Sequence, residues 1–290
     1  MSRSDAVTPF SDQPLAYARI PVPSPAAAAR FAIDVLGLER SDEKEFAFRS
    51  DDRRRSIMFT DEAAPLAIGI ALADEGALER QAEMLSSRQI SVTELDGEAC
   101  RSRAVRRGFS ITDPTGHSIE LVARVELSAR RFHPPRDSGL AGFSTVGLRS
   151  RDIDADVRFW CDAIGAEVAD RVGDITYLRL DAAHHRIALY PSDRAGLLYA
   201  SFAVTSHDDL MRNAYLLEER QVRIVHGPGL ETASNRMFVR FQGPDGAVFA
   251  FEFNGNEERG DRRPRQFALD RYALCAWGSP CRDVRELAAA

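Results

Sequence analysis

The sequence has no run of about 20 apolar residues, the length that a membrane helix needs, although 44% of its 290 residues are hydrophobic. Residues 1–14 lack the basic start and apolar centre of a secretory signal. There are only four cysteines, and none forms a Cys-x-x-Cys pair that would indicate a zinc or redox site. These absences favour a cytoplasmic protein in a reducing environment, without a membrane partner.

An excess of basic charge is also missing. The 38 Lys and Arg residues are outnumbered by 44 Asp and Glu residues, and the formal net charge is -6. Because the phosphates of nucleic acids favour a basic surface, the composition disfavours a nucleic-acid partner. The arginines between Arg101 and Arg107 are few and interrupted by apolar residues, and we interpret them as a solvated face.

Several catalytic motifs are absent as well. The sequence contains no glycine-rich phosphate loop after a strand, no Gly-x-Ser-x-Gly elbow and no spacing typical of zinc ligands. Nucleotide chemistry, serine hydrolysis of the elbow type and zinc catalysis are therefore disfavoured.

An internal repeat is present. Near the N-terminus a short strand precedes a helix from Ser24 to Gly37, and later a second short strand precedes a helix from Asp152 to Gly165. The two glycines are 128 residues apart. Ser and Asp are typical N-cap residues, and glycine suits the left-handed position that ends a helix. The spacing therefore predicts two domains that begin in the same way.

The ends of the two repeats match too. Residues 108–121 have the pattern of a strand, a Pro-x-Gly turn ending at Gly116, and a second strand. Residues 239–251 repeat this pattern around Gly246, 130 residues after Gly116. Proline fixes φ and glycine permits a positive φ, so each motif indicates two strands joined by a tight turn.

The repeat divides the chain into four parts. We expect a first domain over 1–130, a linker over 131–140, a second domain over 141–262 and a C-terminal tail over 263–290. Strands alternate with one helix in each half of each domain. The fold class is therefore α+β, with a curled mixed sheet around a pocket and helices outside. The expected inner helices are 75–87 and 206–220, followed by strands at 89–92 and 223–225.

These features resemble the vicinal-oxygen-chelate superfamily, and within it the type I extradiol ring-cleavage dioxygenases. The resemblance covers almost the whole chain and implies two βαβββ modules in each domain. It rests on an ordered set of short motifs: residues 15–17, Asp113-Pro-Thr-Gly-His-Ser-Ile-Glu120, Phe132-His-Pro-Pro-Arg136, residues 152–155, His184-His185, Gly227-Pro-Gly229, Gly243-Pro-Asp-Gly246 and residues 272–280.

In the extradiol family the second domain holds Fe(II), or sometimes Mn(II), with two His and one Glu. This triad leaves positions open for a catechol and O2. The resemblance places Thr145, Tyr199 and Ala250 at the three ligand positions, so none carries the family's ligand. Glu252 lies two residues beyond Ala250 and points to the same face of the strand, but the two histidines are still missing. We therefore expect no bound metal and no cofactor, and Glu252 at a solvated or interface edge.

Other positions of the family's pocket keep polar side chains. The resemblance matches His184 and His185 to a histidine pair whose second member is an acid–base residue, and it matches Glu231, Arg240 and Asn235 to further pocket positions. We predict His185, Tyr199, Glu231 and Arg240 as catalytic residues. We predict Thr145, His184, Asn235 and Ala250 as substrate-binding residues. The competing interpretation is that Glu231 and Arg240 pair with each other and only fill the space.

The first domain has no comparable set. Glu120 lies at its ligand position, but Tyr17 and Ala67 stand where its partners would be, so we interpret Glu120 as structural. We expect His117, in the turn before it, to be exposed.

Three functions remain open at this point. The favoured hypothesis is a metal-independent enzyme of aromatic or phenolic metabolism that uses acid–base chemistry, such as hydrolysis, isomerisation or C–C cleavage. The first alternative is an Fe(II) extradiol catechol dioxygenase with atypical ligands. The second is a non-enzymatic protein that binds an aromatic molecule. In each case the partner is a small aromatic or ring-derived molecule, and we expect a homodimer or a larger homo-oligomer.

Overall fold

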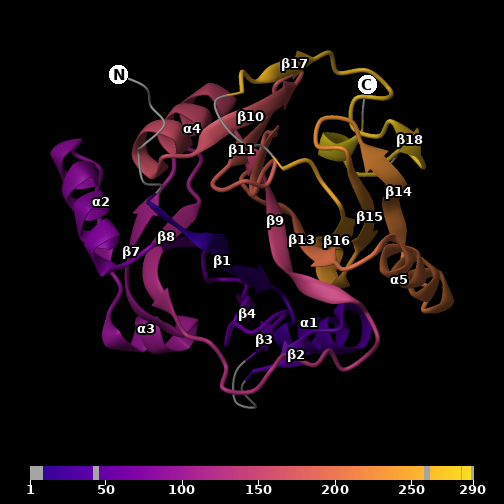
Figure 1. Cartoon of the computed structure of the whole chain (residues 1–290), viewed down its shortest axis with the longest axis horizontal. Coiled ribbons are helices and arrows are strands. Elements are labelled where there is room, and N and C mark those ends of the chain that lie inside the picture. The colour runs from indigo at the N-terminus through magenta and orange to yellow at the C-terminus, as the bar shows by residue number, and fades with distance from the viewer. Residues whose placement is uncertain (1–8, 42–45, 258–261, 282, 289–290) are drawn as a thin grey trace.

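The computed structural model describes residues 9–41, 46–257, 262–281 and 283–288 (Figure 1). It contains two domains, each built on a mixed sheet. The elements of the first domain are β1 (Phe10–Val22), α1 (Pro25–Phe31), β2 (Glu39–Arg40), β3 (Ala47–Arg49), β4 (Ile57–Asp61), β5 (Ala67–Leu72), α2 (Glu75–Ser87), β6 (Thr93–Glu94), α3 (Gly97–Arg103), β7 (Val105–Thr112) and β8 (Ser118–Val125).

The second domain follows the same order and continues into a C-terminal tail. Its elements are β9 (Leu140–Ser150), α4 (Ile153–Phe159), β10 (Glu167–Val172), β11 (Ile175–Arg179), β12 (Ile187–Pro191), β13 (Gly196–Val204), α5 (His207–Glu219), β14 (Ile224–Glu231), β15 (Arg236–Gln242), β16 (Val248–Phe253), and in the tail β17 (Arg265–Phe267) and β18 (Trp277–Gly278).

Each domain contains one module twice: a strand, a helix and three strands. The modules meet where their first strands pair antiparallel, β1 with β5 and β9 with β13. Within each module the first and last strands run parallel, as β9 and β12 do. The predicted α+β class, with two βαβββ modules in each of two domains, is confirmed.

The first helix of each domain begins and ends as its sequence predicts. The side chains of Ser24 and Asp152 accept hydrogen bonds from backbone N–H groups three residues later. Both helices continue into a five-residue π-helical turn and end at a glycine with positive φ, 75° at Gly37 and 91° at Gly165. Only glycine adopts this conformation at little cost, so these positions fix where the chain leaves the helix.

The segment around residue 95 differs from the expectation. The strand predicted at 89–92 is absent, and only the exposed pair β6 forms after it. The unpredicted helix α3 follows, capped by Asp96, whose carboxylate accepts the Ala99 N–H. The interpretation of the neighbouring arginines as a solvated face is wrong for Arg103, which is 7% exposed and bound to Glu120. Charge alone did not show that α3 turns this side chain inward.

The two domains share one apolar core. Phe31 of the first domain packs against Phe249 of the second, with 5.8 Å between ring centroids. A polar contact joins them elsewhere, since the backbone N–H of Gly196 donates to His117 Nε2 at 3.1 Å. His117 is only 2% exposed and its Nδ1 lies 2.8 Å from Asp113, so the prediction of an exposed His117 is wrong.

The C-terminal tail supplies both edges of the second sheet. Strand β17 pairs with β10 at one end of the sheet, and β18 pairs with β14 at the other (Figure 1). Between and after these strands, Leu274, Cys281 and Leu287 pack into the apolar cluster of the second domain that contains Tyr177, Tyr190 and Tyr199. The tail therefore packs on its own second domain and closes one side of that domain's interior.

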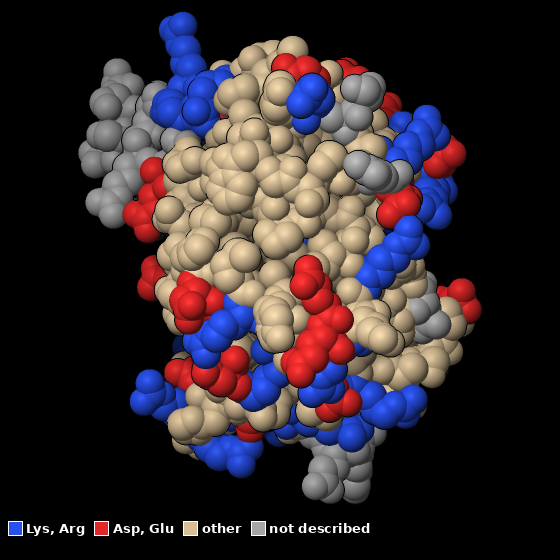
Figure 2. All heavy atoms as spheres, turned by 90° about the vertical axis from the view of Figure 1, so that its right-hand side faces the viewer, with Lys and Arg blue, Asp and Glu red and all other residues tan. Residues whose placement is uncertain are grey.

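The surface on the β14 and β18 side is unevenly charged. Charged side chains gather in its lower part, whereas a wide upper area shows almost none (Figure 2). Tyr272 and Trp277 of the tail are 52% and 50% exposed. None of the helices in the described part of the chain has the length and apolar character of a membrane span.

Candidate functional site

Four residues lie on one level across a single face of the second sheet. Backbone pairing places Thr145 of β9 opposite Ser201 of β13. Ser201 lies opposite Ala250 of β16, and Ala250 lies opposite Arg240 of β15. Directly paired residues of neighbouring strands point to the same face. The sheet therefore brings together three predicted residues, Thr145, Ala250 and Arg240.

Tyr199 lies one level away from this row. It pairs with Gly147, and its ring covers that glycine so closely that a Cβ on Gly147 would lie 2.4 Å from the ring. Ser201, which was not predicted, occupies the level of Thr145 and Ala250.

Glu252 binds Thr145, at one end of this row of four paired residues. Thr145 Oγ1 donates to Glu252 Oε1 at 2.6 Å, and Arg236 Nη1 donates to the same oxygen at 3.0 Å. The same Nη1 also donates to Thr145 Oγ1 at 3.0 Å. Glu252 is 6% exposed, so the prediction of a solvated or interface edge is wrong. Burial raises its pKa, but the charge of Arg236 and the hydrogen bonds outweigh burial, and the net pKa lies below its ordinary value.

Arg240 forms a second ion pair deeper in the domain. Its Nη2 donates to Glu231 Oε1 at 3.0 Å, and its Nη1 lies 3.1 Å from His226 Nδ1. The guanidinium lies over the rings of Phe238 and Tyr199, 4.2 and 4.7 Å from their centroids. Stacking of this kind stabilises a buried cation. Glu231 and Arg240 therefore pair with each other, as the competing interpretation held.

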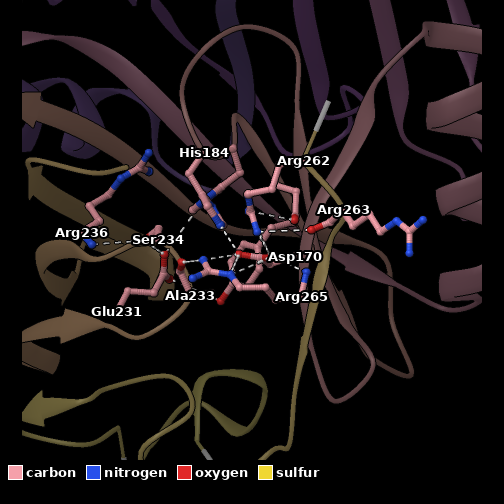
Figure 3. A network of polar contacts seen from close by, with 12 residues as sticks. Asp170, His184, Glu231, Ala233, Ser234, Arg236, Arg262, Arg263 and Arg265 are labelled. Carbon is pink, nitrogen blue, oxygen red and sulfur yellow. Dashed lines mark hydrogen bonds and ion pairs between the residues drawn. The ribbon is translucent and has the colours of Figure 1, made fainter. Parts of the chain in front are cut away.

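A chain of buried side chains runs from Glu231 towards the tail (Figure 3). His185 Nε2 lies 4.0 Å from Glu231 Oε2, and His185 Nδ1 lies 2.9 Å from His184 Nδ1. His184 Nε2 lies 2.8 Å from Asp170 Oδ2. Both histidines are at most 1% exposed. Burial, together with the positive charge of Arg236, holds the pKa of His185 well below its ordinary value, so the imidazole is neutral.

Two arginines hold the outer end of this chain. Arg265 donates from Nη2 to Asp170 Oδ2 at 2.6 Å, and Arg262 donates to Asp170 Oδ1 at 3.2 Å (Figure 3). Burial raises the pKa of Asp170. Hydrogen bonds from Arg265, His184 and Arg262 lower the pKa by more than burial raises it, so it lies well below its ordinary value. Asp170 is therefore ionised and accepts a hydrogen bond from His184 Nε2.

The interior next to Arg240 contains buried polar atoms that lack a well-formed hydrogen bond among the described residues. Tyr190 and Tyr199 are buried, with ring centroids 5.9 Å apart. Among the described residues, no hydrogen bond of good geometry reaches Tyr190 Oη, Tyr199 Oη, Ser201 Oγ or Arg240 Nε, although the two tyrosine hydroxyls lie close enough to affect each other's pKa. Burial and the neighbouring Tyr190 raise the pKa of Tyr199 well above its ordinary value, so the phenol is neutral. A buried polar atom without a partner costs about 1–3 kcal/mol, and four in one place indicate that a ligand or water completes them.

One predicted site residue lies elsewhere. Asn235 is exposed in the turn between β14 and β15, with a φ of 55°. Asparagine tolerates this left-handed conformation, which suits the tight turn. The structure thus places the Asn235 side chain on the surface rather than in the buried interior, and its role in substrate binding stays a prediction.

Several site residues were not predicted, namely Arg236, Ser201, His226 and Asp170. Arg236 had a signal in the sequence, since it alternates with Phe238 and Arg240 along one strand and must share their face. Asp170 had none, because only the fold brings β10 beside His184 and the tail.

The chain resembles known proteins in both sequence and fold. A family model described as the Glyoxalase/Bleomycin resistance protein/Dioxygenase superfamily matches residues 142–251. The matched residues run from β9 to β16 of the second domain. The whole chain has the two-domain vicinal-oxygen-chelate fold, as similar solved structures show.

Two relatives align with nearly the whole chain. A 3-methylcatechol 2,3-dioxygenase of Pseudomonas putida is 27% identical over 290 residues, covering 93% of this chain and 98% of the relative. An iron-dependent extradiol dioxygenase of Rhodococcus jostii is 26% identical over 294 residues, covering 93% and 97%.

Two solved structures illustrate the shared vicinal-oxygen-chelate fold. A halotolerant catechol dioxygenase superposes with a TM-score of 0.85 at 19% identity, covering 96% of this chain and 97% of the other. A Mn(II)-bound glyoxalase from Novosphingobium aromaticivorans has a TM-score of 0.82 at 24% identity, covering 96% and 94%. At these identities the likeness concerns the fold alone.

The relatives contradict the favoured hypothesis from the sequence. Both relatives that span the chain are named as dioxygenases, and the similar structures include two catechol dioxygenases. The prediction of a metal-independent hydrolase, isomerase or C–C cleaving enzyme is therefore wrong. The comparisons agree better with the first alternative, an extradiol catechol dioxygenase.

The donor set of this vicinal-oxygen-chelate domain does not fit the metal of an extradiol dioxygenase. Fe(II) and Mn(II) sites of this kind use imidazole and carboxylate ligands. Thr145 and Ser201 offer only neutral hydroxyls, and Ala250 offers no donor. The nearby carboxylate of Glu252 is bound by Arg236. Within 9–41, 46–257, 262–281 and 283–288, no group of three or more His, Cys, Asp or Glu side chains could hold a metal ion.

Proposed function

We propose that this protein acts in the metabolism of aromatic compounds and binds a small hydroxylated aromatic molecule in its C-terminal domain. The whole-length relatives support the compound class, because their names refer to 3-methylcatechol and to extradiol cleavage. The single observation that carries the binding role is the group of buried polar atoms around Tyr199 that lack a well-formed hydrogen bond among the described residues. A phenolic hydroxyl can both donate and accept, so it can satisfy the Tyr190 and Tyr199 hydroxyls and Arg240 Nε.

The surroundings of these atoms suit an aromatic ring. Tyr177 and Tyr190 belong to the same buried apolar cluster as Tyr199, and the Phe238 ring centroid lies 4.2 Å from the Arg240 guanidinium carbon. Aromatic pairs prefer offset or edge contacts, and such contacts stabilise a bound ring. Leu274 and Leu287 of the tail pack on the same region, so a ligand that enters from that side displaces part of the tail.

A second candidate is extradiol ring cleavage, and the aligned length favours it. Relatives named as dioxygenases match 93% of the chain without truncation of either domain. The names of these relatives support an enzymatic function for this chain. Function is nevertheless determined by the site rather than by the fold, and the donor set around Thr145 does not fit the metal. We therefore take ligand binding as the conclusion and ring cleavage as the alternative to be tested beside it.

One set of measurements separates the two functions. Calorimetry with catechol, 3-methylcatechol and phenol should show binding, and the methyl ethers of the same compounds should bind at least tenfold more weakly because they cannot donate a hydrogen bond. The Tyr199→Phe variant, which keeps the ring, should lose the same preference. Oxygen uptake with each catechol, after incubation with Fe(II) under argon, should stay at background. Ring-fission product would establish the dioxygenase instead, and an absence of binding would refute our proposal.

Two further expectations remain proposals. The cysteines of the described chain, Cys100, Cys161, Cys275 and Cys281, are all free, which agrees with a reducing cytoplasmic setting. The wide uncharged area in Figure 2 and, separately, the half-exposed Tyr272 and Trp277 agree with a homo-oligomer. Sedimentation of the purified protein at several concentrations tests the second of these.

A further inference from the structure

An arginine reaches a residue at one of the ligand positions that the family resemblance implies. Arg236 Nη1 lies 3.0 Å from Thr145 Oγ1, the side chain at the first family ligand position. It also lies 3.0 Å from Glu252 Oε1, the carboxylate oxygen that accepts a hydrogen bond from Thr145 Oγ1. One cationic nitrogen therefore bridges a hydroxyl and a carboxylate at the level where a metal ion would bridge its ligands.

The first domain contains the same arrangement at the equivalent level. Tyr17 lies opposite Gly69, and Gly69 lies opposite Glu120, as Thr145, Ser201 and Ala250 do in the second domain. Tyr17 donates to Glu120 Oε2 at 2.7 Å. Arg103 binds the two carboxylate oxygens of Glu120 at 2.7 and 2.6 Å. A hydroxyl, a carboxylate and a guanidinium thus meet at the centre of both domains.

The two arrangements are not copies of each other in sequence. Arg103 comes from the end of α3, whereas Arg236 comes from the start of β15. Glu120 stands on the level of Tyr17, whereas Glu252 stands two residues beyond Ala250. The chain thus reaches the same set of groups by different residues, which indicates that each domain centre needs a buried cation against a carboxylate.

We propose that the guanidinium of Arg236 takes the place of the divalent metal ion in the C-terminal domain. The charges support the exchange: Glu252 is 6% exposed and ionised, so it requires a cation nearby, and Arg236 is 7% exposed and supplies one. A guanidinium holds oxygens by directed N–H bonds, but it cannot change its oxidation state or bind O2. The centre of the second domain is therefore a fixed ion pair, as in the first.

This inference is independent of ligand binding and can fail separately. If a metal occupies the site while catechols still bind, the role of Arg236 is refuted and the proposed binding function is not. If catechols do not bind, but the protein takes up no metal and Arg236→Ala is destabilised, the proposed binding function is refuted and the role of Arg236 is not.

The test combines metal analysis with matched variants. Purified protein is incubated under argon with Fe(II), Mn(II) or Zn(II), passed through gel filtration and analysed by mass spectrometry. We expect no stoichiometric metal. Arg236→Ala leaves Glu252 buried without its cation and should lower the Tm by about 10 °C. Arg103→Ala, the matched change in the first domain, should act similarly.

A double variant keeps the test valid if Arg236→Ala fails to fold. Arg236→Met with Glu252→Leu removes both charges and keeps the volume, so it should recover most of the wild-type Tm. The same recovery is expected for Arg103→Met with Glu120→Leu. One equivalent of metal in the wild-type protein that is lost in Glu252→Gln would overturn the proposal. A wild-type Tm for Arg236→Ala would overturn it too.

Discussion

His184 and His185 face each other through their Nδ1 atoms, 2.9 Å apart, and only one of these atoms can carry the proton between them. Asp170 is ionised and lies 2.8 Å from His184 Nε2, so that nitrogen carries a proton. His184 Nδ1 is then an acceptor and His185 Nδ1 is the donor. The remaining nitrogen, His185 Nε2, has a free lone pair that faces Glu231 at 4.0 Å.

The first prediction is this pair of tautomers. In ¹⁵N-edited spectra of the folded protein, His184 should show a protonated Nε2 and His185 a protonated Nδ1, unchanged from pH 6 to 8. Asp170→Asn removes the charge that orients His184 and should alter both patterns. Two identical tautomers in the wild-type protein would contradict the chain as described.

The second prediction concerns pH. Burial and the charge of Arg240 lower the pKa of His226 to about 2, whereas an unfolded histidine titrates near 6.5. Between these values the unfolded chain binds a proton that the folded chain does not, so stability falls as the pH falls below about 6.5. His226 alone should reduce the free energy of unfolding by about 1.4 kcal/mol between pH 7.5 and 5.5.

Urea denaturation at the two pH values measures this loss. The buried His184, whose pKa burial also lowers, adds to it in the same direction. His226→Gln, which keeps an acceptor for Arg240, should remove its share of the pH dependence. An equal pH dependence in the variant and the wild-type protein would show that His226 titrates normally.

The third prediction distinguishes two buried tyrosines. The Tyr199 hydroxyl has no well-formed hydrogen bond among the described residues, so Tyr199→Phe should be neutral or should stabilise the free protein by up to about 1 kcal/mol. Tyr177 OH donates to Glu231 Oε1 at 3.4 Å, so Tyr177→Phe should be neutral or slightly destabilising. Thermal unfolding without ligand checks both. A loss above about 2 kcal/mol for Tyr199→Phe would mean that its hydroxyl is already satisfied.

The fourth prediction concerns the tail. Arg265 joins β17 to Asp170 and also donates from Nη2 to the backbone oxygen of Ala233 at 2.6 Å. Because Arg265 is 45% exposed, solvent weakens its ion pair, and Arg265→Met should cost only about 1–2 kcal/mol. The same change should speed exchange of the β17 amides with solvent. Unchanged exchange would show that β17 is held by its strand pairing with β10 alone.

The fold was predictable from the sequence because the internal repeat consists of local signals, namely helix caps and helix-ending glycines. The caps at Ser24 and Asp152 and the glycines at Gly37 and Gly165 act on the residues beside them, and both domains share them. The short strands β2 and β6 were missed or misplaced, because a pair of exposed residues has no apolar pattern. The helix α3 was missed since its buried face consists of Cys100 and an arginine.

The site was less predictable from sequence. Thr145 and Ala250, which were placed by counting from a helix start and from a turn, lie on one level of the sheet. Positions that depend on long-range contacts do not follow from counting, as Ser201, Asp170 and the exposed Asn235 show. The ionic partners of Glu252 and Glu231 also required the fold, because each arginine reaches its carboxylate across neighbouring strands.

The most direct test of the central claim is a crystal structure determined after soaking with Fe(II) under argon, with anomalous data collected at the iron edge. We predict no anomalous peak among Thr145, Ser201 and Ala250, and the Arg236 guanidinium bound to Glu252 and Thr145. An iron peak at that position, with Arg236 turned away and Glu252 among the ligands, would contradict our description of the site.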